Sequence, residues 1–180
     1  DGAPIGGEAE HAQMVAELAA SPRNVHGRVG ARLHPVHHAA FATESEILVR
    51  GAGDRLAYLM LPKAQSLADV QAACDLIDHH SRVRGLRHQI PLHVLVETHG
   101  ALAEVAAIAA HPRIESLSFG LMDFVAAHRG AIPQSAVSAS GQFEHPLVVR
   151  AKLEIAAACH AHAKTPSHCV VTEFKHASAL

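Results

Sequence analysis

Aromatic side chains are scarce in this chain of 180 residues, which has no Trp, one Tyr and five Phe. A core built around a large aromatic cluster is therefore excluded. Hydrophobic residues nevertheless make up 49% of the chain, and 35 residues are Ala, which favours helices and close packing of helices against a sheet. The same apolar content excludes an intrinsically disordered chain.

The sequence also lacks an excess of one charge, long apolar runs and paired cysteines. Its 15 basic and 17 acidic residues give a formal charge of −2 without a basic run, so we expect neither nucleic acid nor an anionic membrane surface as main partner. No apolar stretch approaches the roughly 18 residues of a transmembrane helix. Cys74, Cys159 and Cys169 have no C-x-x-C spacing, which fits the reducing cytoplasm rather than a disulfide framework.

Short apolar runs alternate with helical patterns along the chain. We expect strands at residues 28–34, 57–63, 92–98, 116–121 and 169–174. Apolar residues at helical spacing predict helices over residues 8–20, 41–49, 66–83, 100–110 and 146–163. Residues 130–142, rich in Ser, Ala and Pro, predict a long loop that forms a lid or part of a site. This alternation is typical of a parallel α/β fold.

Length alone leaves the architecture of that fold open. A (β/α)8 barrel typically needs about 250 residues and a doubly wound sheet needs fewer, so 180 residues favour the doubly wound sheet on this ground. The chain opens on Asp1-Gly2-Ala3-Pro4 without an initiator Met, and we expect a fragment of a longer protein.

Four consecutive predicted strands end on or near a charged side chain, namely Arg32, Lys63, Glu97 and Asp123. Active sites of parallel α/β folds lie at the carboxyl ends of the strands, so we expect these four side chains to face a common rim. Glu97 and Asp123 form a pair of carboxylates whose oxygen ligands suit Mg2+ or Mn2+. The guanidinium of Arg32 can form two parallel hydrogen bonds with a substrate carboxylate. The alternative is that strand-end charges meet solvent or pair with one another.

Five segments in this order resemble the HpcH/HpaI aldolase and citrate lyase β-subunit family. The resemblance extends over most of the chain, from about residue 28 to 174. Its motifs are Gly30-Ala31-Arg32-Leu33-His34, Leu61-Pro62-Lys63-Ala64, Val96-Glu97-Thr98, Ser118-Phe119-Gly120-Leu121-Met122-Asp123-Phe124 and Gln142-Phe143-Glu144-His145-Pro146.

The resemblance implies a (β/α)8 TIM barrel that makes or breaks C–C bonds, often in acyl-CoA substrates, with Mg2+ or another divalent ion. It matches Glu97 and Asp123 to metal-ligand positions and Arg32 to the arginine that holds the carboxylate or keto-acid end of the substrate. It also places Gly120 and Leu121 in the substrate-binding segment. Family members commonly form trimers or hexamers, so a homo-oligomer is expected.

The sequence departs from the family pattern at two residues and at its ends. His34 stands where Asn is usual, and His99 stands beside the metal position where Pro or Ala is commoner. Asp1-Gly2 resembles the tail of the family's acidic Asp-Leu-Glu-Asp motif, and by this resemblance we expect the eighth strand to be absent after Phe174. We therefore expect residues 1–180 to form a single but incomplete barrel domain, with about strands two to seven.

The general base of the implied reaction is not fixed by the sequence. His99 and Lys63 are candidates for proton transfer, and Lys63 as a Schiff-base lysine is an alternative to metal chemistry. The cluster of His34, His37 and His38 is interpreted as surface histidines rather than a zinc site, because Pro35 interrupts it. His93 lies inside a predicted strand and is expected to be an interior residue.

These observations favour a cytoplasmic, divalent-metal-dependent C–C lyase or aldolase that cleaves a 3-hydroxyacyl-CoA or a related hydroxy or keto acid. One rival is an acyl-CoA thioester hydrolase that uses the same site. The other is a catalytically inactive subunit that binds a partner protein.

Overall fold

The computed structural model describes residues 4–173 and 175, and the chain divides into two compact units. Unit 1 contains residues up to 62 and residues 68–94, and unit 2 contains residues 63–67 and those from 95 onward. The expected motif tail at Asp1-Gly2 and the end of the last predicted strand at Phe174 lie outside the described residues. Within the described part of the chain, no helix is long and apolar enough to span a membrane.

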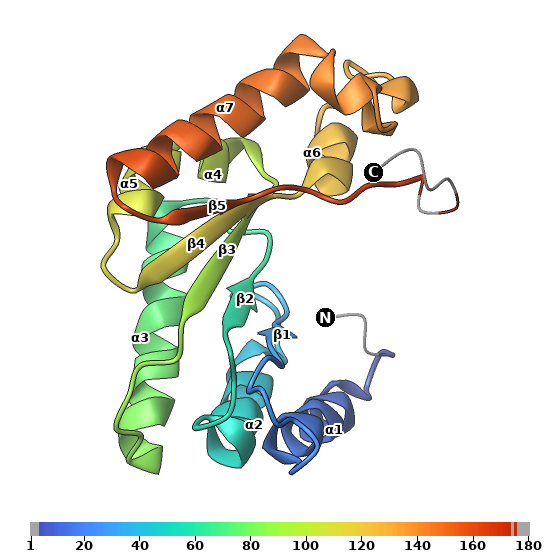
Figure 1. The fold of residues 1–180 in the computed structure, drawn as a ribbon. Coiled ribbons are helices and arrows are strands. Elements are labelled where there is room, and N and C mark those ends of the chain that lie inside the picture. The colour runs from blue at the N-terminus through green and yellow to red at the C-terminus, as the bar shows by residue number, and fades with distance from the viewer. Residues whose placement is uncertain (1–3, 174, 176–180) are drawn as a thin grey trace. The chain divides into compact units, whose positions relative to one another are not determined.

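Unit 1 alternates helices with short strands. Its elements are α1 (Glu8–Ala20), β1 (Ala31–Arg32), α2 (Phe41–Ala52), β2 (Leu59–Leu61), nearly all of α3 (Leu67–Arg84) and the first three residues of β3 (Leu92–Val96). Helices α1 and α2 pack side by side (Figure 1), and the buried residues of α1 are Ala12, Ala16 and Ala19. A Cβ on Gly51 would lie 2.9 Å from the Cβ of Ala16, so the close approach of the two helices depends on this glycine.

Unit 2 continues the same alternation. Its elements are the end of β3, α4 (His99–Ala103), α5 (Val105–Ala110), β4 (Ile114–Phe119), α6 (Leu121–Ala127), the 3-10 turns η1 (Gln134–Val137) and η2 (Gly141–Phe143), α7 (Pro146–Ala161) and β5 (Thr165–Ser167). Helix α7 packs on β4 and β5 (Figure 1). Pro146 is its first residue, where the missing N–H removes no helical hydrogen bond.

The five strands follow one another in the order β1-β2-β3-β4-β5, so each strand neighbours the next in sequence. The pairs β1 with β2, β2 with β3, and β4 with β5 are parallel. Helices connect the strands, as parallel neighbours require. The predicted parallel α/β fold is therefore confirmed, and its sheet is open.

Strand β3 is the most buried strand. Leu92, Val94 and Val96 have no exposed area, and His93 on the opposite face is 8% exposed. Side chains of successive residues point to opposite faces of a strand, so both faces of β3 are covered. The prediction that His93 is an interior residue is confirmed, and burial lowers the pKa of this imidazole to about 4.

The last strand was predicted wrongly at residues 169–174, because β5 lies at Thr165–Ser167. Helix α7 ends early: Ala163 adopts a left-handed φ of 54°, and Lys164 N–H donates to Cys159 O at 2.8 Å. The chain therefore turns into the sheet before the apolar run, and Ser116–Ser118 of β4 pair with Thr165–Ser167. Thr172 instead donates a hydrogen bond to Val137 O at 2.8 Å.

Two other predictions need smaller corrections. The helix predicted over residues 100–110 is divided at Glu104 into α4 and α5, since the φ of −106° and ψ of 14° at Glu104 are not helical. The predicted loop over residues 130–142 contains η1 and the start of η2. Helix α6 was not predicted, because its seven residues are too short for a helical pattern to stand out.

Candidate functional site

Glu97 follows the last residue of β3 and is only 3% exposed. Its Oε1 accepts a hydrogen bond from the backbone N–H of Lys63, over 2.9 Å. Both residues belong to unit 2. A buried carboxylate with one backbone donor keeps acceptor capacity on its other oxygen, which a cation or an acidic proton can use.

Asp123 lies in the first turn of α6, immediately after β4. Its Oδ1 is 3.4 Å from Lys63 Nζ, and both side chains are about half exposed, at 51% and 46%. The turn into α6 passes so close to Glu97 that any Cβ on Gly120 would overlap the Glu97 side chain. Gly120 therefore allows the two carboxylates to approach each other.

The backbone of Lys63 is held in an uncommon conformation. Its φ of 53° lies in the left-handed region, which costs a non-glycine residue about 1–3 kcal/mol. The next residue, Ala64, accepts a 2.6 Å hydrogen bond from Thr98 Oγ1, which itself accepts from Ala101 N–H at 3.0 Å and caps α4. These bonds hold residues 63–64 against the segment that carries Glu97.

The pKa of Glu97 is raised from 4.5 to about 7, and burial is the largest cause of this change. The negative charge of Asp123 and a hydrogen bond with its carboxyl group also raise the pKa, whereas the Lys63 N–H and ammonium lower it. Near neutral pH the carboxylate pair is therefore electrostatically unfavourable by itself. A cation bound to both groups would relieve this repulsion.

The donor set fits Mg2+ or Mn2+ and does not fit a structural zinc site. Within residues 4–173 and 175, no group of three or more His, Cys, Asp or Glu side chains could hold a metal. Mg2+ needs fewer protein ligands, because it commonly binds one or two carboxylates and completes its shell with water and substrate oxygens. Glu97 and Asp123 supply that number of carboxylates at one place.

Arg32 lies in unit 1, where it is an exposed residue of β1. It lines a pocket of about 230 Å³ together with His34 and Glu44. The interpretation of His34 as a surface histidine is wrong, since its side chain is 13% exposed and its Nδ1 lies 2.8 Å from Glu44 Oε2. Glu44 also accepts the His34 backbone N–H. His34 and Glu44 are ten residues apart in the sequence, so no local sequence pattern predicts that they interact.

His99 and Leu121, the remaining predicted site residues, lie in unit 2. His99 is exposed, and its Nε2 donates to Ala127 O over 3.3 Å while its ring meets the His128 ring edge-on at 4.5 Å. The Leu121 side chain is 1% exposed and packs in the core. Of the four strand-end charges, the structure thus brings together Lys63, Glu97 and Asp123.

Comparison with known proteins gives matches over nearly the whole chain. The HpcH/HpaI aldolase/citrate lyase family profile matches residues 8–175. A solved citrate lyase from Burkholderia xenovorans is 49% identical with a TM-score of 0.96, over 99% of this chain and 56% of that one.

Curated relatives match over shorter segments. An L-malyl-CoA/beta-methylmalyl-CoA lyase from Cereibacter sphaeroides is 38% identical over 80 residues, which are 44% of this chain and 25% of the relative. A (3S)-malyl-CoA thioesterase from the same species is 35% identical over 72 residues, or 40% of this chain and 22% of the relative. The matched region thus spans about a quarter of these relatives. Together with the family profile and the recognised motifs, the matches show that the chain belongs to the HpcH/HpaI aldolase/citrate lyase family.

Proposed function

We propose that this chain carries the metal-binding part of a divalent-metal-dependent C–C lyase. Its substrate would be a 3-hydroxyacyl-CoA or a related hydroxy or keto acid. The observation that carries the proposal is the buried Glu97 carboxylate beside Asp123 and Lys63, at the ends of two neighbouring strands. The relative named as a malyl-CoA lyase supports the substrate class.

The chemistry of the proposal follows from the charge that cleavage produces. Breaking the C–C bond of a 3-hydroxyacyl group leaves an enolate, which must be stabilised. Mg2+ or Mn2+ held by Glu97 and Asp123 would supply a Lewis acid at the oxygens of the substrate. The Lys63 ammonium lies against Asp123 and adds positive charge beside the same carboxylate pair.

Arg32 is proposed to bind the carboxylate end of the substrate, an assignment that rests on the family motif. A guanidinium can form two parallel hydrogen bonds with a carboxylate and so fix its orientation. Gly120 and Leu121 are proposed to bind substrate through their main chain, since Gly120 has no side chain and that of Leu121 is buried. A homotrimer or homohexamer is proposed on the family resemblance, and a cytoplasmic location on the three cysteines without C-x-x-C spacing.

His99 and Lys63 are the two candidates for proton transfer. Because His99 Nε2 donates to a backbone carbonyl, the neutral ring has its lone pair on Nδ1. The Lys63 ammonium would first have to lose a proton to act as a base or to form a Schiff base. Substituting the true base should lower kcat and leave KM nearly unchanged.

A thioester hydrolase is the second candidate, because a relative named (3S)-malyl-CoA thioesterase matches 40% of the chain. The same carboxylate pair would then activate water toward the thioester carbonyl. The two reactions release different products. A lyase releases a shorter acyl-CoA and a carbonyl compound, whereas a hydrolase releases free CoA and the intact hydroxy acid.

The experiment is product analysis of a 3-hydroxyacyl-CoA panel that includes malyl-CoA, incubated with the protein and Mg2+. We expect a shorter acyl-CoA from the wild type and from Glu115→Gln, which removes an exposed carboxylate of β4. We expect at least a 10²-fold lower rate from Asp123→Asn. Release of free CoA would favour the hydrolase. No product from any substrate, with no Mg2+ binding, would favour the inactive subunit.

A further inference from the structure

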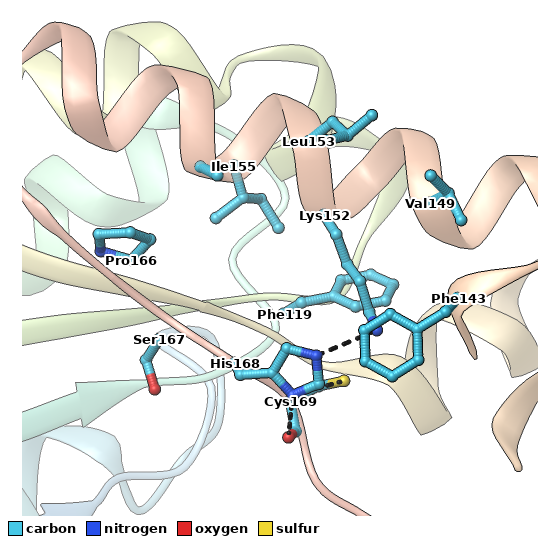
Figure 2. Close-up of a pocket in the computed structure, with 11 residues that line it drawn as sticks. Phe119, Phe143, Val149, Lys152, Leu153, Ile155, Pro166, Ser167, His168 and Cys169 are labelled. Atoms are coloured by element: carbon cyan, nitrogen blue, oxygen red, sulfur yellow. Dashed lines mark hydrogen bonds between the residues drawn. The ribbon is translucent and has the colours of Figure 1, made fainter. Parts of the chain in front are cut away.

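Unit 2 contains a pocket between α7 and the segment that includes β5 (Figure 2). Its volume is about 330 Å³, and most of its walls are apolar, with Phe119, Val149, Ile155 and Pro166 among them. Lys152 projects from α7 toward His168 and the ring of Phe143 (Figure 2). None of these pocket residues belongs to the Glu97–Asp123 site.

Three groups surround the amine of Lys152. Its Nζ donates to Gln142 Oε1 at 2.8 Å and lies 3.2 Å from Nε2 of His168. It also stands 4.0 Å from the centre of the Phe143 ring, within the range of a cation–π contact. The amine is thus held in one place at the edge of an apolar cavity.

The hydrogen bonds of His168 determine which of its nitrogens faces the amine as an acceptor. Its Nδ1 lies 2.9 Å from the backbone carbonyl of Cys169, and a carbonyl oxygen can only accept. Nδ1 therefore carries the proton, and in the neutral ring Nε2 presents its lone pair to Lys152. An imidazole acceptor beside a nucleophile can take up the proton that the nucleophile releases.

Cys169 is the other nucleophile of the cluster. Its Sγ donates to the same Gln142 Oε1, at 2.9 Å, and Gln142 is completely buried. Burial lowers the pKa of Lys152, which increases the fraction of free amine, and burial raises the pKa of Cys169, which keeps the thiol protonated. The amine is thus the better acceptor of an electrophile in this pocket.

We propose that Lys152 accepts an acyl group from an acyl-CoA thioester that enters this pocket. The amine nitrogen attacks the thioester carbonyl, and His168 Nε2 takes a proton from the nitrogen. The C–S bond then breaks, and CoA leaves as a thiolate that recovers a proton. The product is an amide on Lys152 whose N–H can still donate to Gln142, with the acyl chain against the apolar walls.

The inference rests on the proposed function only in its choice of ligand, since acyl-CoA is the substrate class proposed for the Glu97–Asp123 site. Acylation would remove the positive charge over Phe143. It would also fill part of the pocket. Lys152 is therefore assigned as a modification site whose occupancy depends on acyl-CoA supply.

The test is peptide mass spectrometry of the full chain after incubation with acetyl-CoA at mildly alkaline pH. Lys175, which is exposed, serves as an internal reference in the same molecule. We expect acetylation of Lys152 roughly 10²-fold faster than of Lys175, and His168→Asn should abolish the difference. The control is His160→Asn, which replaces an exposed histidine of α7, the helix that carries Lys152, and should leave the rate unchanged.

Two further variants, Cys169→Ser and Asp123→Asn, complete the test. Cys169→Ser should retain the fast reaction, because the amine attacks directly. Equal rates at Lys152 and Lys175, or loss of the reaction in Cys169→Ser, would overturn the proposal. Asp123→Asn separates the two hypotheses: it should abolish cleavage of acyl-CoA but leave acetylation of Lys152 intact, so either hypothesis can fail alone.

Discussion

Replacing Glu97 by Gln should stabilise the protein at alkaline pH. The carboxylate is 3% exposed and its pKa is raised to about 7, whereas the unfolded chain has an ordinary pKa of 4.5. Between these two pH values the unfolded state ionises while the folded state keeps its proton. The free energy of unfolding therefore decreases as pH rises from about 4.5 to about 7, and above that range the loss of stability is complete.

The size of the effect follows from the two pKa values. Each pKa unit corresponds to about 1.4 kcal/mol, so the change from 4.5 to about 7 corresponds to about 3 kcal/mol. Gln has the same shape and still accepts the Lys63 N–H, but it cannot ionise. The difference in unfolding free energy between Glu97→Gln and wild type should thus shift by about 3 kcal/mol in favour of the variant between pH 4 and pH 8.

Urea unfolding followed by far-ultraviolet circular dichroism measures this difference, since a chain without Trp gives little fluorescence change. The comparison must be between variants, because the two proteins share all their other ionisable groups, whose contributions then cancel. Glu115→Gln, which removes an exposed carboxylate, is the control and should follow the wild type. A constant difference between Glu97→Gln and wild type from pH 4 to pH 8 would refute the reasoning.

Three other predictions concern the remaining buried or crowded groups. His93→Asn should make the protein less sensitive to acid. The pKa of His93 is lowered to about 4, so the wild type loses up to about 3 kcal/mol of unfolding free energy as pH falls from 6.5 to about 4. Urea titrations of both proteins at these two pH values measure the difference. Gly120→Ala should destabilise the protein by about 1–3 kcal/mol in thermal unfolding and weaken Mg2+ binding, because the added Cβ overlaps the Glu97 side chain. The control is Gly130→Ala, at a φ of 90° with no atom near the added Cβ, which should leave Mg2+ binding intact. Glu44→Gln should lower the free energy of unfolding in urea by about 1–3 kcal/mol, since it weakens a buried acceptor of two hydrogen bonds from His34. An unchanged urea midpoint would argue against a stabilising role of these hydrogen bonds.

The local parts of the fold were predictable from the sequence. Apolar runs located β3 and β4, and the helical pattern of α1 gave its observed bounds, Glu8–Ala20. The position of Glu97 and Asp123 at neighbouring strand ends followed from the order of the strands, because parallel connections bring those ends to one edge.

Features that depend on contacts between distant residues were not predictable. The overlap that Gly120 avoids involves Glu97, and the partner of His34 is Glu44, so neither is visible as a local pattern. The error at β5 has the same origin: its apolar run suggested a strand, but the end of α7 determined where the chain entered the sheet. Lys152 gave no signal, since its setting depends on Gln142 and His168.

The central claim is that Glu97 and Asp123 together hold a divalent cation, and calorimetric titration of Mg2+ at pH 8 tests it most directly. At this pH Glu97 is mostly ionised, given its pKa of about 7. The account predicts a saturable isotherm for wild type and for Glu115→Gln, and none for Asp123→Asn. An isotherm that is the same in wild type and Asp123→Asn, or absent from wild type, would contradict it.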